Sequence, residues 1–463
     1  MASSKMHHAL IAKLRQALSG QFLAGVIKLA GAAALAQAVL LGTLVLATRL
    51  YSPADFGVLA VFNAVVTTVA VAACLRFDIA VPLPREQKDA VNLLGLALLS
   101  AVAVACLFSL FVALAPEALA LQIFDASVYK HLWLAGPAIF FLAGMSALQN
   151  WFIRQKAYGI VARNRIVQAL VHASIQLGGG WFVAAPVFLV LAQMANYATA
   201  VVVLGGVFLL QGRGLLRHLT AGGMRSVASE YRQFPIYSTW EAFFNAAGIF
   251  VPVILIGALA PPAEVGHLQL GLYAMQALIG LVGAAIAQVY FSRAAEEHAA
   301  GRLADFTGTV LVNLAKTGPG PLLAIGIAAP FVFPLIFGEE WARSGILVAW
   351  MTPWFVLQFL ASPISLALAV TRRQKAAFLL QLFGFVFRSG AVLFAAFAMN
   401  GYVTEAYALS GFVFYAAYLA VIMVTSRISI SRIVSDIGSI ALIWSFWIIL
   451  AGIVSTVATV WIR

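Results

Sequence analysis

The sequence predicts an all-α polytopic membrane protein with about thirteen transmembrane helices (twelve to fourteen). Of its 463 residues, 63% are hydrophobic and 10% are charged, and the mean hydropathy is +0.99. Soluble domains carry about 25% charged residues. Long apolar runs follow one another along the chain, and short tracts of the first half return in the second. These observations predict two parallel-repeat lobes of six helices around a central cavity.

The N-terminal residues predict a short helix at the membrane interface. Leu10, Leu14 and Leu18 fall on one helical face, and Lys13 lies on another. The apolar run that follows, at about 22–47, is longer than the roughly 7–15-residue core of a cleaved signal peptide. We therefore expect an interfacial helix that leads into a first membrane span.

A bilayer-spanning helix needs roughly 20 apolar residues. Thirteen stretches meet this condition, at about 21–47, 56–81, 90–115, 131–152, 166–184, 186–210, 235–258, 267–291, 306–335, 345–367, 376–399, 403–425 and 437–461. Two prolines in Gly318-Pro319-Gly320-Pro321 predict a kink or break in the ninth. The expected division is an interfacial helix at 1–20, an N-lobe at 21–212, a cytoplasmic linker at 213–233, a C-lobe at 234–425 and an additional transmembrane helix at 426–463.

Three pairs of similar tracts, in the same order, indicate an internal duplication. The first pair is Ser52-Pro53-Ala54-Asp55-Phe56-Gly57 and Pro261-Pro262-Ala263-Glu264-Val265-Gly266, the second is Ile123-Phe124-Asp125 and Ile336-Phe337-Gly338-Glu339, and the third is Arg154-Gln155-Lys156-Ala157 and Arg373-Gln374-Lys375-Ala376. Because the repeats are six helices apart, both copies have the same orientation in the membrane. Alternating-access carriers are built from facing repeats of this kind.

The distribution of Lys and Arg predicts a cytoplasmic N-terminus. With that orientation, twenty of the 28 Lys and Arg face the cytoplasm, and only Arg49, Lys130, Arg343 and Arg463 face the other side. Basic residues concentrate in cytoplasmic loops. The net charge of +12 then reflects membrane insertion and anionic lipids, and no nucleic-acid partner is expected.

The sequence predicts neither an enzyme nor a metal protein. It contains no Walker A, D-x-D, H-E-x-x-H or C-x-x-C motif, and no carboxylate pair is spaced for catalysis. Cys74 and Cys106 both lie in apolar runs and are expected to act as small buried hydrophobic residues. No catalytic residue, metal ligand or cofactor is therefore expected.

Three tracts resemble the bacterial polysaccharide transporter family of O-antigen and exopolysaccharide repeat-unit flippases. They are Arg49 to Gly57, Leu75-Arg76-Phe77-Asp78-Ile79-Ala80, and Ile336-Phe337-Gly338-Glu339-Glu340-Trp341. This family belongs to the superfamily that also holds multidrug antiporters and the lipid II flippase. The resemblance implies a multi-pass protein of the bacterial inner membrane. It also implies an undecaprenyl-pyrophosphate-linked oligosaccharide as substrate, moved from the cytoplasmic to the periplasmic leaflet.

Ionisable residues within the spans are the candidate site residues, because they are costly unless they face a cavity or a partner. The cations Lys28, Arg76, Lys316 and Arg388 are expected to bind substrate in the central cavity. The candidates for ion coupling or for counter-ions are Asp78, His172 and Glu241. Four of them have a structural alternative: snorkelling for Lys28, interhelical ion pairs for Arg76 and Asp78, and a hydrogen-bonded core position for His172.

Stripes of polar residues give two further expectations. Gln168, His172 and Gln176 share a helical face with Arg165, which predicts a hydrated wall. Arg388 is deep in its span and either grips pyrophosphate or pairs with an acid such as Glu241.

Three functions remain open from the sequence. The first is a lipid-linked oligosaccharide flippase, and the second is a cation-coupled multidrug antiporter. The third is a membrane-embedded glycan ligase or polymerase, for which no catalytic set is visible. The driving force could be H⁺, Na⁺ or the membrane potential. A monomer is expected, with the polysaccharide polymerase and chain-length machinery as candidate partners.

Overall fold

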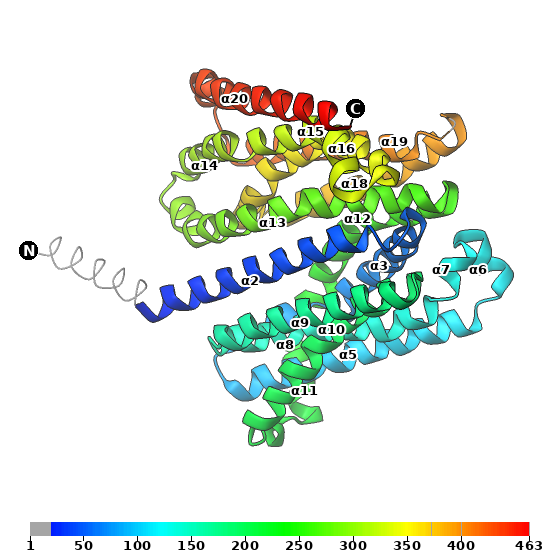
Figure 1. Ribbon diagram of the computed structural model, residues 1–463. Helices are drawn as coiled ribbons and strands as arrows, with labels where there is room; N and C mark the ends of the chain where they lie inside the picture. The colour runs from blue at the N-terminus through cyan, green and yellow to red at the C-terminus, as the bar shows by residue number, and fades with distance from the viewer. Residues whose placement is uncertain (1–19, 372, 400, 463) are drawn as a thin grey trace, which may run out of the picture.

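The protein is an all-helical bundle, as the sequence predicts. The computed structural model describes residues 20–371, 373–399 and 401–462, and its regular elements are all helices (Figure 1). The interfacial helix expected at 1–20 lies outside the described residues, except for Gly20.

The long helices overlap the expected spans. They are α2 (Gly20–Ala47), α3 (Pro53–Ala73), α5 (Gln87–Leu114), α8 (Ala135–Arg154), α9 (Tyr158–Phe182), α10 (Pro186–Gln211), α12 (Thr239–Leu259), α13 (Pro262–Ala299), α14 (Leu303–Thr317), α15 (Pro319–Phe337), α16 (Ala342–Ala361), α18 (Gln374–Ala398), α19 (Val403–Thr425) and α20 (Ile430–Ile462). Among the described residues, ten segments are long and apolar enough to cross a membrane. The exact number of thirteen therefore stays a prediction.

Shorter helices lie in the connections. They are α4 (Phe77–Ala80), α6 (Glu117–Ile123), α7 (Ala126–Tyr129), η1 (Leu132–Leu134), η2 (Leu215–His218), α11 (Ala221–Glu230), η3 (Phe234–Ser238), η4 (Glu339–Trp341), η5 (Ser362–Ile364) and α17 (Ala367–Val370).

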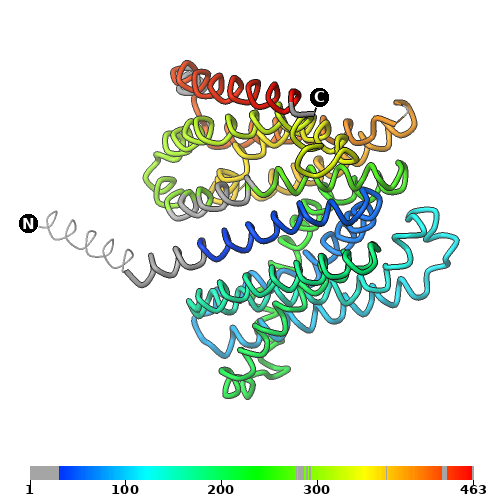
Figure 2. Tube along the Cα trace, viewed as in Figure 1, coloured from blue at the N-terminus to red at the C-terminus, as the bar shows by residue number. Residues whose placement is uncertain are grey.

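The helices of each half pack mainly on one another. In the first half α9 packs against both α2 and α10, and in the second half α18 packs against both α12 and α19. Helix α3 joins the halves because it packs against α12 and α13 (Figures 1 and 2). We call the end of the bundle with the α2–α3 and α12–α13 connections the repeat end, since both copies of the 52–57 tract lie there. The opposite end, which carries Arg85, Arg154 and Arg373, is the basic end.

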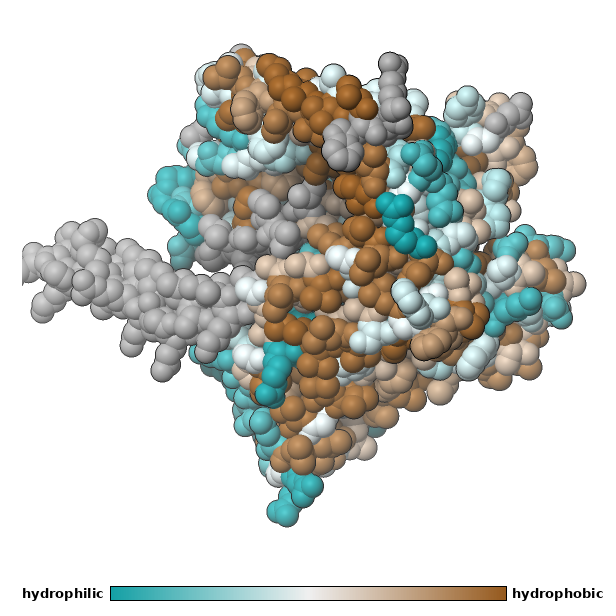
Figure 3. All heavy atoms as spheres, viewed as in Figure 1, coloured by the Kyte–Doolittle hydropathy of each residue, from teal (hydrophilic) through white to brown (hydrophobic). Residues whose placement is uncertain are grey.

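The surface agrees with a membrane location. On the face shown in Figure 3, apolar side chains cover much of the bundle, and hydrophilic side chains gather toward the ends of the helices. Large apolar side chains such as Phe111, Phe397 and Leu442 are strongly exposed, which is expected where lipid rather than water surrounds the protein.

The start of α3 follows from its sequence. Ser52 is the N-cap, and its hydroxyl accepts a hydrogen bond from the backbone N–H of Asp55, while the Asp55 carboxylate accepts one from the Ser52 backbone. This reciprocal capping box satisfies two N–H groups that the helix leaves free. Pro53 fits the first turn because its missing N–H has no helical partner there.

The expected single helix at 56–81 is wrong at its C-terminal end. Helix α3 ends at Ala73, and Leu75 and Arg76 adopt left-handed φ angles of 50° and 60° before α4 begins. Left-handed non-glycine residues do not continue a right-handed helix. Asp78 therefore does not share a helical face with Asn63 and Cys74, as a continuous helix would require.

The predicted break in the ninth span is confirmed between α14 and α15. Pro319 has no N–H to donate to the carbonyl of Ala315, so this acceptor loses its helical partner. The indole Nε1 of Trp444 in α20 donates to that carbonyl at 2.8 Å, and Lys316 forms a 2.6 Å ion pair with Asp436 of the same helix. Helix α20 thus supplies a donor for the Ala315 carbonyl and an ion pair beside the break.

Trp444→Phe should destabilise the attachment of α20 by about 1–3 kcal/mol, because the Ala315 carbonyl would be left without a partner. Thermal unfolding of the purified protein in detergent measures the loss. Trp447→Phe is the matched control, since the Trp447 ring packs on Gly320 and its N–H has no bond to the described residues. An equal loss in both variants would show that ring packing, not the hydrogen bond, holds α20.

Candidate functional site: a polar cavity between the halves

A cavity of about 560 Å³ lies between α2, α3, α9, α10 and α13. Its volume is within the roughly 300–1,000 Å³ typical of small-molecule sites. Four of the five helices belong to the first half of the chain, and α13 belongs to the second. The cavity is therefore bounded by elements of both repeats, which is where alternating-access carriers bind substrate.

Helix α9 provides one polar wall of the cavity. Arg165, Gln168, His172 and Gln176 all line it, and their spacing places them on one helical face. Ion-pair geometry within the described residues gives Arg165 no carboxylate partner. The four residues form the stripe that the sequence singles out, and the structure places all four on the cavity.

The other four helices add more apolar than polar side chains to the lining. The polar ones are Gln37 of α2, Gln193 and Asn196 of α10, and Tyr273 and Gln276 of α13. No Asp or Glu is among the residues that line the cavity. Its polar groups are thus one guanidinium, one imidazole, one phenol and a set of amides, and the rest of the lining is apolar.

The α2–α3 connection covers the cavity toward the repeat end. Tyr51 donates a hydrogen bond of 2.7 Å to the backbone carbonyl of Gln176, and its ring packs closely on Gly180. Burial, with a smaller contribution from Asp55, raises the pKa of Tyr51 to about 12, so its hydroxyl remains a donor at neutral pH.

The two copies of the duplicated tract meet at the repeat end. A Cβ on Gly57 would lie 2.2 Å from the carbonyl oxygen of Pro262, and a Cβ on Gly266 would lie 1.7 Å from that of Pro53. Only glycine permits this approach of α3 and α13. The contact is reciprocal, since the glycine of each copy faces the proline carbonyl of the other.

Further contacts between the halves surround this packing. The Arg49 guanidinium donates to the carbonyls of Leu335 and Ile336 at the C-terminal end of α15, at 3.1 and 3.0 Å. The indole of Trp341 donates to the carbonyl of Thr48 at 3.0 Å. The bundle is therefore closed at the repeat end.

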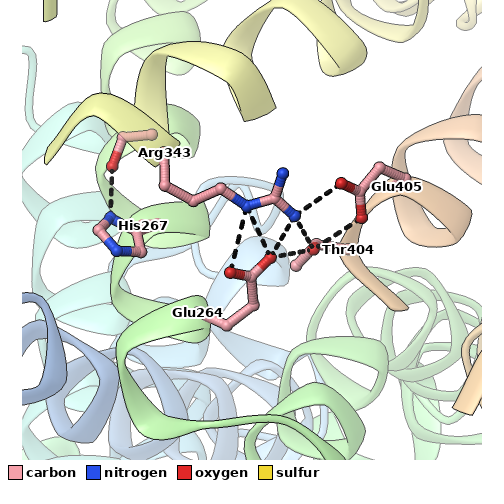
Figure 4. A network of polar contacts seen from close by, with 6 residues as sticks. Glu264, His267, Arg343, Thr404 and Glu405 are labelled. Carbon is pink, nitrogen blue, oxygen red and sulfur yellow. Dashed lines mark hydrogen bonds and ion pairs between the residues drawn. The ribbon is translucent and has the colours of Figure 1, made fainter. Parts of the chain in front are cut away.

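A charged network holds the second copy of the tract in place (Figure 4). Arg343 of α16 contacts Glu264 of α13 at 2.7 Å and Glu405 of α19 at 2.6 Å, and Thr404 donates to Glu264. His267 lies beside this group and is hydrogen-bonded to Ser344 at 3.1 Å. The network ties together the first turns of α13, α16 and α19.

Of the seven charged or titratable candidates from the sequence, only His172 is among the residues that line the cavity. Lys28 is in α2, but its side chain is outside the described part of the structure. Arg76 lies between α3 and α4 and interacts electrostatically with Glu241 of α12, without ion-pair contact.

The remaining candidates have partners elsewhere. Asp78 is buried and accepts a 2.5 Å hydrogen bond from Ser146, and Lys316 pairs with Asp436. Arg388 is 2% exposed, donates to the carbonyl of Gly248 at 3.1 Å and lies over the Phe414 ring at 4.2 Å. Among the described side chains, the structure therefore does not bring the predicted cations Arg76, Lys316 and Arg388 together in one cavity.

The sequence reasoning missed the amides of α2, α10 and α13, because it searched the spans for charge. A signal was present: Gln193 and Asn196 are three residues apart, and Tyr273 and Gln276 repeat the same spacing. Polar residues at helical spacing in an apolar helix indicate a polar face. Applied to neutral polar side chains as well as charges, that criterion would have found four of the cavity residues.

Comparison with known proteins agrees with this architecture. Comparison with curated protein sequences gives no match. Among solved structures, the chain is similar to the lipid II flippase MurJ in an inward closed conformation, with a TM-score of 0.66, 10% identity, and coverage of 94% of this chain and 98% of that one. It is also similar to the eukaryotic MATE transporter AtDTX14, with a TM-score of 0.51, 17% identity, and coverage of 88% and 98%.

These structural similarities show the fold, and the match to a sequence-family model shows which protein family the chain is related to. The family model described as "Polysaccharide biosynthesis protein" matches residues 45–345, which is more than half of the chain and includes most of the residues that line the cavity. The chain belongs to this polysaccharide biosynthesis protein family.

Proposed function

We propose that this protein carries a lipid-linked oligosaccharide repeat unit from the cytoplasmic to the periplasmic leaflet by alternating access. The observation that carries the proposal is the cavity between the repeats, with Arg165 and a set of amides on its walls. A guanidinium suits a phosphate group, and amides suit sugar hydroxyls. The family and the flippase-like fold support the same function.

The size and position of the cavity agree with a repeat unit rather than a finished polymer. At about 560 Å³ it has the volume of a small-molecule site, and the contacts between α3 and α13 close the repeat end. We place the basic end in the cytoplasm of a bacterial inner-membrane protein, because basic loops stay on that side. The cavity would then receive its substrate from the cytoplasmic leaflet.

An antiporter for cationic drugs fits the cavity less well. A site for organic cations needs carboxylates or an aromatic box, whereas no carboxylate is among the lining residues, and their one permanent charge is positive. A ligase or polymerase would need a catalytic set, which the lining does not supply. The coupling ion, a monomeric state and contact with the polymerase machinery remain predictions.

Deletion of the gene should make a lipid-linked glycan accumulate in the membrane and abolish the surface polymer. The wild-type gene should restore the polymer, whereas Arg165→Gln should not, because losing a charged hydrogen bond to phosphate costs about 1.5–3 kcal/mol. Lipid extraction with mass spectrometry measures the intermediate.

Arg163→Gln is the matched control, since Arg163 is on the same turn of α9 but is exposed and outside the cavity lining. Normal polymer in the deletion strain, together with new sensitivity to cationic drugs, would reject the flippase in favour of an antiporter.

A further inference from the structure

The permanent positive charge of the cavity lies at one end of α9. Arg165 lies seven residues from the start of the helix at the basic end, and Gln176 lies near the repeat end, where Tyr51 contacts it. Eleven residues of helix separate the two, about 16 Å. The cation is thus at one end of this wall, and neutral groups extend toward the other.

The neutral part of the wall has unsatisfied hydrogen-bonding groups. Gln168 is 6% exposed and its amide Nε2 has no partner among the described residues, and Nδ1 of His172 is also without one. A buried polar atom without a partner costs about 1–3 kcal/mol. Both residues line the cavity, but the two unpaired atoms are themselves buried, so a side-chain rotation that turns them toward a bound group would remove this cost.

The amide side chains of the lining indicate which chemical groups the cavity can bind. Each offers a carbonyl acceptor and two N–H donors, and the lining contains Gln37, Gln168, Gln176, Gln193, Asn196 and Gln276. Sugar hydroxyls both donate and accept, so they can pair with either side of an amide. Apart from Arg165, the lining residues include no Lys or Arg that could bind a second phosphate.

We propose that the cavity holds its substrate in one orientation, with the phosphate at Arg165 and the sugars against the amides of α9 and α10, so that Gln168 and Gln193 select the glycan. This inference rests on the proposed function and adds the division of labour within the site. Arg165 recognises the part that all lipid-linked substrates share. The amides recognise the part that differs between them.

Two lipids test the proposal with the full-length protein in nanodiscs. One is undecaprenyl diphosphate without sugar, and the other is the lipid-linked glycan purified from the deletion strain. Gln168→Leu should weaken binding of the glycan lipid roughly 5- to 100-fold, because sugar hydroxyls would lose a buried partner. The affinity of the Gln168→Leu variant for undecaprenyl diphosphate should not change. Arg165→Gln should weaken binding of both lipids.

Two further variants guard against a general effect on folding. Gln193→Leu removes an amide of the adjacent helix α10, whose Nε2 donates a hydrogen bond to the Tyr197 hydroxyl, and should show the same selectivity as Gln168→Leu. Gln381→Leu is the control, because Gln381 is equally a buried glutamine but lies in α18, outside the cavity lining. It should leave binding of both lipids unchanged.

The possible failures are distinguishable. Equal weakening of both lipids by Gln168→Leu and Gln193→Leu, or no weakening at all, would overturn the division of labour while leaving the flippase function intact. If the wild-type protein binds neither lipid, or the deletion strain accumulates none, the proposed function itself fails, and this inference fails with it.

Discussion

Gly57→Ala should open the repeat end of the bundle. The added Cβ would lie 2.2 Å from the carbonyl oxygen of Pro262, and backbone atoms cannot turn aside as the end of a side chain can. Overpacking of this kind costs about 1–3 kcal/mol, roughly a 5- to 150-fold change in an equilibrium between closed and open states. Gly266→Ala should act in the same direction, because its Cβ would lie 1.7 Å from the Pro53 carbonyl.

The opening can be measured as access to the cavity. Cys74 and Cys106 are first replaced by alanine, and Gln276→Cys then places a single thiol on the cavity lining. A membrane-impermeant thiol reagent, added from the side of the repeat end, should label this position slowly in the parent and much faster after Gly57→Ala.

Gly42→Ala is the matched control, because a methyl group at this position of α2 meets no atom within 4 Å. If Gly57→Ala leaves labelling from the repeat end unchanged in a folded protein, the glycine–proline contact does not keep the bundle closed. A protein that fails to accumulate would instead show that the contact is needed for folding, and thermal unfolding separates these outcomes.

The sequence predicts the architecture well because hydropathy and duplication are direct signals. Every expected span overlaps a long helix, and the break beside Pro319 is where two prolines remove helical donors. The end of α3 was not predictable in the same way. Leu75 and Arg76 lie in an otherwise continuous apolar stretch, and no glycine or proline marks their left-handed conformation.

The site was predicted less completely, because charge in a span has several physical outcomes. Lys316 looks like a cavity cation in the sequence, but its partner Asp436 is 120 residues away on α20. A single sequence does not reveal such a distant pairing. The α9 stripe was identifiable because Arg165, Gln168, His172 and Gln176 recur at the helical period, which is a local property.

Arg388 shows how the two repeats have diverged. At the shift of 219 residues that relates Arg154 to Arg373, Arg388 corresponds to Ala169. Ala169 lines the cavity in the first half. In the second half the guanidinium is enclosed by the rings of Phe414, Trp354 and Tyr415, at 4.2, 5.4 and 5.4 Å. In the second half, the Arg388 side chain therefore fills the place that corresponds to the cavity beside Ala169 in the first half.

Arg388→Ala should mainly lower the stability of the protein. Each cation–π contact is worth up to about 2 kcal/mol when desolvated, and truncating a large buried side chain to alanine costs about 3–5 kcal/mol. The abundance of folded protein, measured by fluorescence-detected size exclusion, should fall together with its thermal stability. Arg388→Met should recover most of both, because it refills the volume and leaves no buried charge to solvate.

Two outcomes separate this structural role from substrate binding. Because no ion pair joins Arg388 to Glu241 among the described residues, adding Glu241→Ala should not rescue Arg388→Ala. If Arg388→Ala accumulates and unfolds like the wild type but no longer supports transport, the guanidinium must contact substrate in another conformation. Arg388→Met would then fail in the same way, since a thioether cannot replace a guanidinium at a phosphate. Retained transport in Arg388→Met would instead assign Arg388 to the packing of the second half and leave Arg165 to hold the phosphate.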